Sequence, residues 1–180
     1  MRRFAAIAGP LVAIALLVGT APAVASPMSD RESVPGSALK AYRTMAKPYK
    51  HTAPTGYGAI TDNQGISCIA DPAGTGAMGI HYLNGDELFD GEIDADQPEA
   101  FVYAPGPHGK LVALEYLVIK DVWDDSHSGP PELFAGHPFM ETGAPNRFDL
   151  PPYYSQHVWI GRGNPNGNLA MWNPAVHCPS

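Results

Sequence analysis

Basic residues are scarce in this sequence, and their scarcity limits the partners that the protein can attract. The chain has 11 lysines and arginines against 18 aspartates and glutamates, which gives a formal net charge of −7 at pH 7. Because an acidic surface repels phosphate backbones, the composition argues against nucleic-acid binding.

The common catalytic signatures are also missing. The sequence contains no G-x-S-x-G elbow, no phosphate-binding G-x-x-x-x-G-K-[ST] loop, no G-x-G-x-x-G opening a helix and no H-E-x-x-H zinc motif. No reaction can therefore be assigned from a local motif. A catalytic group assembled from distant residues stays open, because such groups are recognised by geometry and not by their order in the chain.

Long hydrophobic runs are absent except at the N-terminus. There a basic start, Arg2-Arg3, precedes an apolar run over residues 4–18 and then Ala23-Val24-Ala25. This order predicts a signal peptide over residues 1–25. Gly9 and Pro10 interrupt the run, which disfavours a retained anchor, since a spanning helix needs about 18 unbroken apolar residues. We expect a secreted or periplasmic protein with no membrane span after cleavage.

Cysteine is limited to Cys68 and Cys178. An even pair in an exported protein predicts a disulfide. The alternative, two thiolate ligands of a metal, lacks a close C-x-x-C spacing.

Residues 26–55 are expected to form a flexible N-terminal segment followed by a short helix over residues 37–47. Leu39, Tyr42 and Met45 recur at three-residue spacing and give an apolar stripe, and Pro48 ends the pattern. Residues 56–180 are expected to form a single β-rich domain.

Short apolar runs separated by Gly, Pro, Asn and Asp indicate strands in this domain. The candidates are Ala77–Leu83, Ala100–Tyr103, Leu111–Ile119 and residues 156–161. Residues 121–154 contain many Gly and Pro and are interpreted as a long loop, a candidate lid or rim. The predicted fold is mainly β, a barrel or a sandwich, with one N-terminal helix, in the α+β class.

Three polar residues interrupt apolar strands and form the candidate functional site. They are His81, Glu115 and His157. A carboxylate in so apolar a strand is costly unless it is paired or ligated. Two imidazoles and one carboxylate can hold a zinc, iron, copper or manganese ion with coordination positions left open.

Two other interpretations of these residues stay open. Glu115 can pair with His81, His157 or Arg162 in a buried hydrogen-bonded network, or the three positions can be unrelated. Aromatic side chains can line a small-molecule pocket nearby or simply pack in the core; these are Tyr82, Tyr103, Tyr116 and Trp159.

Three functions are therefore compatible with the sequence. A metal enzyme would activate water or dioxygen at the open position. A binding domain would hold a small ligand without transforming it, and an envelope-associated interaction domain would need no small-molecule site.

Several segments together resemble a widespread family of small secreted bacterial proteins to which no activity is attached. They are Gly56-Tyr57, Cys68 and residues 76–82 (GAMGIHY), 98–103 (PEAFVY), 114–116 (LEY), 157–160 (HVWI), 164–167 (NPNG) and 172–178 (WNPAVHC). The resemblance implies export, one domain and a Cys68–Cys178 disulfide. This sequence departs from the family pattern at Gly161, where the resemblance leads us to expect a second aromatic residue after the His-x-Trp pair.

Overall fold

A computed structural model describes residues 34, 36–134 and 136–179 of the chain. The predicted signal peptide, residues 1–25, lies outside these residues, as does most of the segment before the first helix. Among the residues described, no helix combines the length and the apolar character needed to cross a membrane.

The first described element is helix α2, Gly36–Met45, followed by the 3₁₀ helix η1, Lys47–Tyr49. Leu39 and Tyr42 are buried, so the apolar stripe of the sequence is the face that packs on the rest of the protein. Pro48 begins a new, tighter turn because it has no N–H to continue the α-helical ladder. The predicted helix is confirmed, with its end two residues earlier.

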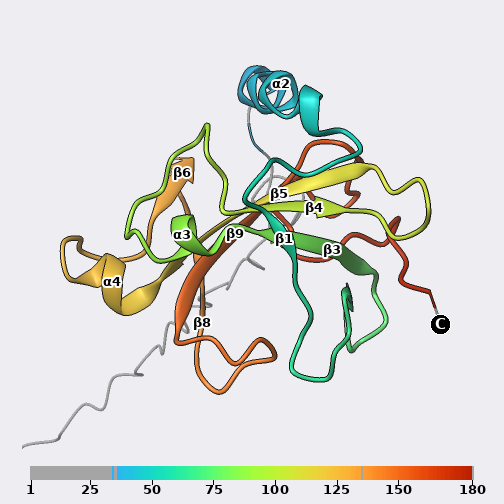
Figure 1. Cartoon of the computed structure of the whole chain (residues 1–180). Helices are drawn as coiled ribbons and strands as arrows, with labels where there is room; N and C mark the ends of the chain where they lie inside the picture. The colour runs from blue at the N-terminus through green and yellow to red at the C-terminus, as the bar shows by residue number, and fades with distance from the viewer. Residues whose placement is uncertain (1–33, 35, 135, 180) are drawn as a thin grey trace, which may run out of the picture.

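The domain is built on one antiparallel sheet of seven strands (Figure 1). The order across the sheet is β1-β3-β4-β5-β9-β8, and β2 pairs with β3. The bounds are β1 Gly58–Ala59, β2 Cys68–Ala70, β3 Ala77–Leu83, β4 Ala100–Tyr103, β5 Leu111–Ile119, β8 Met140–Thr142 and β9 Tyr153–Trp159. The mainly β, α+β fold class is confirmed, but the sheet is open, so the barrel alternative is wrong.

The remaining elements are short. They are helices α3, Gly85–Leu88, and α4, Lys120–Asp124, and a separate pair of strands, β6, Glu132–Phe134, with β7, His137–Pro138. The prediction of one long loop over residues 121–154 is therefore wrong, because most of α4, all of β6, β7 and β8, and the start of β9 lie within it. Strands of two or three residues carry no period that a sequence pattern can reveal.

Three of the four predicted strands, β3, β4 and β5, have the expected bounds. The fourth, predicted over residues 156–161, is β9 and begins earlier, at Tyr153. Its start is fixed by pairing with β5, where Tyr153 lies opposite Ile119. Its C-terminal end approaches β5 so closely that a Cβ on Gly161 would lie 2.0 Å from the carbonyl oxygen of Leu111. This contact leaves no room for the aromatic residue that the family resemblance leads one to expect there.

The two faces of the sheet have different coverings. The upper face in Figure 1 packs beneath α2 and is rich in aromatic residues, with Phe101, Tyr103 and Tyr116 in one core cluster with Tyr42 of α2. The lower face lies above the loops at residues 60–67 and 143–150. Because successive side chains of a strand point to opposite faces, every second residue faces α2 and the residues between them face the loops below.

The C-terminal segment is fastened to the start of β3. Cys178 forms a disulfide with Cys68 of β2, with a Cα–Cα distance of 5.6 Å, which confirms the predicted pairing. Asn173 exchanges two backbone hydrogen bonds with Ala77, and its carbonyl oxygen lies where a Cβ of Gly76 would be, at 2.3 Å. Glycine is therefore required at residue 76 for this close approach.

Candidate functional site

The three predicted site residues meet on the lower face of the sheet. His81 lies on β3, Glu115 on β5 and His157 on β9. Glu115 and His157 are directly opposite each other across the β5–β9 pair. His81 is separated from Glu115 by β4, whose residue opposite Glu115 is Ala100. The small Ala100 side chain, which lines the same cavity as His81 and Glu115, leaves room below β4 for His81 to reach Glu115.

The carboxylate of Glu115 lies between the two imidazoles. Its Oε2 is 3.0 Å from Nε2 of His81, and its Oε1 is 3.2 Å from Nδ1 of His157. One donor atom from each residue lies within 4.8 Å of the other two. All three residues are buried, with exposed fractions of 2% for His81, 7% for Glu115 and 4% for His157. The convergence of the three side chains is thus a feature of the fold.

Burial opposes ionisation of Glu115, but the charges of His157 and then His81 outweigh it. The pKa of Glu115 is therefore held well below its ordinary value. The site holds a carboxylate anion in a region where an unpaired charge would be strongly disfavoured. Stabilisation has to come from positive charge beside it, supplied by imidazolium groups or by a bound cation.

The imidazole nitrogens are not fully used by the protein. Within the part of the chain that the structure describes, neither ring nitrogen of His81 has a hydrogen-bond partner, nor has Nε2 of His157. Nε2 of His81 faces Glu115 as an ion-pair partner at 3.0 Å, so the nitrogens with no polar partner of either kind among the described residues are Nδ1 of His81 and Nε2 of His157. Buried polar atoms are nearly always hydrogen-bonded, so these unpartnered nitrogens indicate a group that the protein itself does not supply.

The separations fit ligands of one metal ion. With metal–ligand bonds of about 2.1 Å, neighbouring ligand atoms in an octahedron are about 3.0 Å apart, and opposite ones about 4.2 Å. The contact of Glu115 Oε2 with His81 Nε2, at 3.0 Å, matches the spacing of neighbours, and the three donor atoms lie within 4.8 Å of one another, so the site would contract slightly around an ion. Among the described residues, this is the one group of His, Cys, Asp and Glu side chains with metal-binding geometry.

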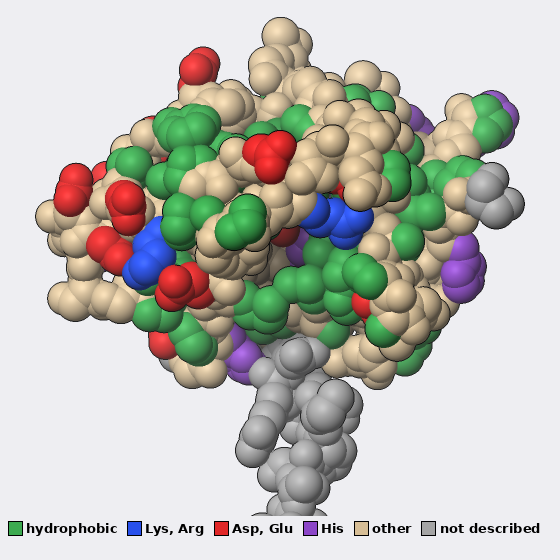
Figure 2. All heavy atoms as spheres, turned by 90° about the horizontal axis from the view of Figure 1, so that it is seen from below, with side chains coloured by type: hydrophobic (Ala, Val, Ile, Leu, Met, Phe, Trp, Pro, Cys, Tyr) green, Lys and Arg blue, Asp and Glu red, His purple; other side chains and the backbone are tan. Residues whose placement is uncertain are grey.

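A cavity of about 40 Å³ borders the cluster at His81 and Glu115. Most of its wall is apolar, and three hydroxyl-bearing residues contribute the remaining polar groups. The other lining residues are Ile60, Met78, Leu83, Ala100, Leu117, Thr142, Phe148, Leu150, Tyr153, Ser155 and Met171. Seen from below in Figure 2, hydrophobic side chains gather around the centre of this side of the molecule.

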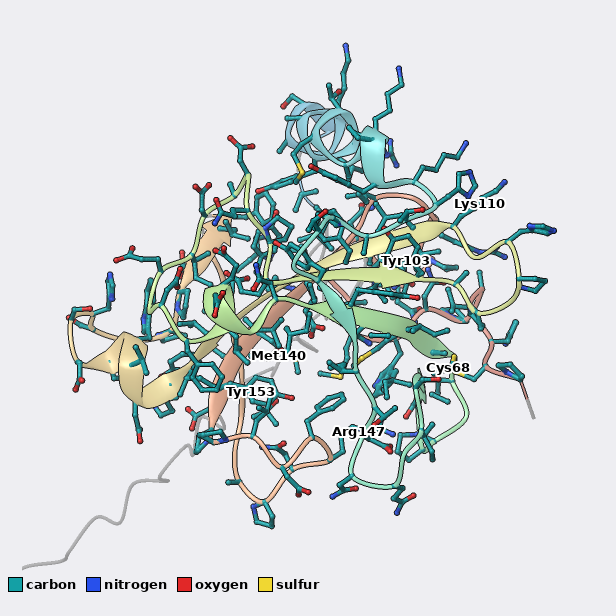
Figure 3. The ribbon with its side chains drawn as sticks, in the orientation of Figure 1. Cys68, Tyr103, Lys110, Met140, Arg147 and Tyr153 are labelled. Carbon is teal, nitrogen blue, oxygen red and sulfur yellow. A yellow bond between two sulfur atoms is a disulfide. The ribbon has the colours of Figure 1, made fainter. Side chains whose placement is uncertain are left out.

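Two loops meet below the cluster. Arg147 forms an ion pair with the buried carboxylate of Asp62, with Nη2 3.1 Å from Oδ2. The backbone N–H of Asn63 donates to the carbonyl oxygen of Arg147 at 2.8 Å. Next to Arg147, the ring of Phe148 packs edge-on against the imidazole of His81, with centroids 6.5 Å apart. Figure 3 shows Arg147 and Tyr153 below the sheet, on the side away from α2.

Of the four predicted pocket aromatics, Tyr82 and Tyr103 lie together, with ring centroids 5.2 Å apart, and the other two lie elsewhere. Tyr82 and Tyr103 line a different cavity, of about 420 Å³, with His51 and His108. Tyr116 is buried on the upper face, where its hydroxyl donates to the carbonyl oxygen of Ala95 at 2.7 Å. The predicted aromatic residues therefore do not line one common pocket.

Trp159 is the one of the four that lies beside the cluster. Its ring stacks on His157 with centroids 5.8 Å apart. Its indole N–H donates to the carbonyl oxygen of Ala170 at 2.6 Å, so it supports the position of His157. The alternative partner of Glu115, Arg162, is exposed.

Sequence reasoning missed the residues that surround the cluster, above all Tyr153 and Phe148. Tyr153 lies on the same strand and face as His157, and it was missed because the predicted strand began too late. Burial, and then the charge of Glu115, raise the pKa of Tyr153 to about 12, which keeps its hydroxyl protonated. Phe148 lies on a loop and contacts His81 from there, and no local sequence pattern predicts such a contact.

Comparison with known proteins gave no match. No protein-family model matches the chain, and no curated protein or solved structure is similar to it at the level that the comparisons required.

Proposed function

We propose that this protein binds one divalent transition-metal ion through His81, Glu115 and His157. The observation that carries the proposal is the convergence of three buried ligand groups, two imidazoles on either side of one carboxylate, with donor atoms within 4.8 Å of one another. A bound cation would offset the charge of Glu115 and give one nitrogen of each imidazole a partner.

The chemistry of the ligand set leaves coordination positions open. Two histidines and one carboxylate on one side of an ion are typical of iron(II) sites that bind dioxygen, and zinc and manganese accept the same donors. When bound, the metal would supply Lewis acidity to a water molecule or a small ligand. Tyr153 and Thr142, which both carry a hydroxyl, line the adjoining cavity.

We further propose that the protein acts outside the cytoplasm as a member of the family that its segments resemble. The Cys68–Cys178 disulfide supports this, because such bonds persist in oxidising compartments. Tryptic mapping of protein recovered from the cell exterior would test it, with the peptide beginning near Ser26 as the expected N-terminus.

Metal content measured by mass spectrometry tests the metal site. Residues 26–180, purified without a histidine tag and with the disulfide formed, should be dialysed against iron(II), manganese, zinc or copper and then analysed. We expect one ion per chain for at least one of these metals. A His157→Ala variant should bind that metal at least about 100-fold more weakly, more than the loss of an outer partner costs.

The matched control is His108→Ala, which removes an exposed histidine from another cavity. It should bind the metal as the wild type does. Failure of the wild type to take up any of the four metals would contradict the proposal and favour a ligand-binding or structural domain with an imidazole–carboxylate network.

A further inference from the structure

The cavity beside the cluster is too small for a ring-sized organic substrate. Its volume is about 40 Å³. For comparison, a cavity of about 150 Å³ in another protein accommodates benzene, and about 10–15 Å³ on the same measure is enough for one water molecule. The space therefore fits a molecule of two or three heavy atoms and excludes an aromatic or sugar ring.

Apart from His81 and Glu115, the wall of the cavity is uncharged and favours a neutral guest. Its apolar side chains include Ile60, Met78, Leu117, Phe148 and Leu150, from four separate segments of the chain. A charged guest would lose its hydration on entering such a space, with few polar groups to replace the lost water. The hydroxyl-bearing residues, Thr142, Tyr153 and Ser155, can donate one or two hydrogen bonds but carry no charge.

The cavity lies directly beside two residues of the cluster. His81 and Glu115 both form part of its wall, whereas His157 does not. An ion held by these three residues therefore has the cavity beside two of its ligands. On this geometry, and resting on the proposed metal site, we infer that the open coordination position receives a small neutral molecule of two heavy atoms, the class to which dioxygen belongs.

Phe148 sets the size limit. Its ring packs edge-on against His81, so it occupies the space next to the proposed metal position. The loop that carries it is held in shape by Asn146, whose side-chain oxygen accepts hydrogen bonds from the backbone N–H groups of Phe148 and Leu150. Its neighbour Arg147 fixes the loop to Asp62. Removing the ring should enlarge the cavity without removing a ligand of the metal.

Nitric oxide is the probe for this inference, because it is a neutral diatomic molecule whose complex with iron(II) has a distinct electron paramagnetic resonance signal. The signal should be recorded on iron(II)-loaded protein without oxygen, with and without imidazole as a competing ring. We expect the wild type to form the nitrosyl complex and imidazole not to suppress it. In Phe148→Ala, imidazole should suppress the signal at a concentration at least about tenfold lower than any that affects the wild type.

Two further variants make the test specific. Leu150→Ala enlarges the same cavity from another side and should change imidazole competition in the same direction. Phe89→Ala removes an exposed phenylalanine that is 53% accessible and does not line the cavity, so it should behave as the wild type.

The outcomes separate the two proposals. Protein that takes up no iron(II) or other metal contradicts the metal site, and this inference falls with it. Protein that retains stoichiometric iron but gives no nitrosyl signal overturns this inference alone. Equal suppression by imidazole in the wild type and in Phe148→Ala would also overturn it, because the cavity would not be limiting the size of the ligand.

Discussion

The upper and lower faces of the sheet differ in whether their polar side chains find hydrogen-bond partners within the protein. On the upper face, the hydroxyls of Tyr57, Tyr103 and Tyr116 each donate to a backbone carbonyl oxygen at 2.6–2.7 Å. On the lower face, His81 and His157 keep nitrogens without a hydrogen-bond partner in the described structure. A buried polar group that is satisfied stabilises a fold, and one that is not satisfied is better explained by a ligand. This difference supports the function proposed for the lower face, whereas the satisfied groups of the upper face contribute to stability.

The largest effect on stability should come from the upper face. Phe101 is 2% exposed and packs edge-on against both Tyr49 and Tyr57, with centroids 5.1 Å away. Phe101→Ala should lower the free energy of unfolding by about 3–5 kcal/mol. Chemical denaturation followed by tyrosine fluorescence measures this. The folded protein should keep its metal, and coupled loss of metal and stability would contradict the division between the faces.

A pH-dependent effect should come from Glu99, the buried carboxyl of the upper face. Burial raises its pKa to about 8, although the N–H of Leu117 donates to Oε2 at 2.8 Å and opposes the shift. Its folded pKa lies above its unfolded one, so the folded state holds a proton that the unfolded state releases. Stability should therefore fall as pH rises from about 4.3, the ordinary pKa of glutamate, towards the folded value, and level off above it.

Glu99→Gln imitates the protonated carboxyl and keeps an acceptor for Leu117. It should stabilise the protein by a few kcal/mol at pH 9 and have little effect at pH 4. Thermal unfolding across this range checks the sign. An equal change at both pH values would show that Glu99 does not titrate as burial predicts.

A smaller loss of stability, with a total loss of metal, is expected when a larger side chain fills the space beside Ala100, below β4. Ala100 is 1% exposed and lies opposite Glu115. Ala100→Leu should cost about 1–3 kcal/mol through overpacking. It should also prevent His81 from reaching Glu115, which metal analysis would detect. Uptake of metal at wild-type affinity would show that this space does not position His81.

The smallest effect on stability, and the sharpest contrast, should come from two adjacent residues. Tyr116→Phe removes one hydrogen bond on the upper face and should cost about 1 kcal/mol, with metal affinity unchanged. Glu115→Gln alters the lower face and should lose the metal, because an amide is a weaker ligand than a carboxylate. Calorimetric titration with the metal compares the two, and a similar affinity in both variants would remove the contrast.

The sequence could predict the central strands and the cluster because both leave local signals. β3, β4 and β5 are apolar runs between turn residues, and His81, Glu115 and His157 stand out because each interrupts such a run. Strands β1, β2 and β6 to β8 are too short to show a period, and β8 exists through its pairing with β9.

The surroundings of the cluster depend on contacts between distant segments. Phe148 reaches His81 because Arg147 is bound to Asp62 and Asn63, more than 80 positions earlier in the chain. Tyr153 faces the cavity through a register that the β5–β9 pairing sets. Such pairings are decided by tertiary packing, so one sequence could not reveal them.

Anomalous diffraction from a crystal of the metal-loaded protein, recorded at the absorption edge of that metal, is the most direct test of the central claim. Our account predicts one strong peak about 2.0–2.2 Å from nitrogens of His81 and His157 and from a carboxylate oxygen of Glu115. No peak there, together with imidazole nitrogens hydrogen-bonded directly to Glu115, would contradict it and show that the cluster is a structural ion-pair network.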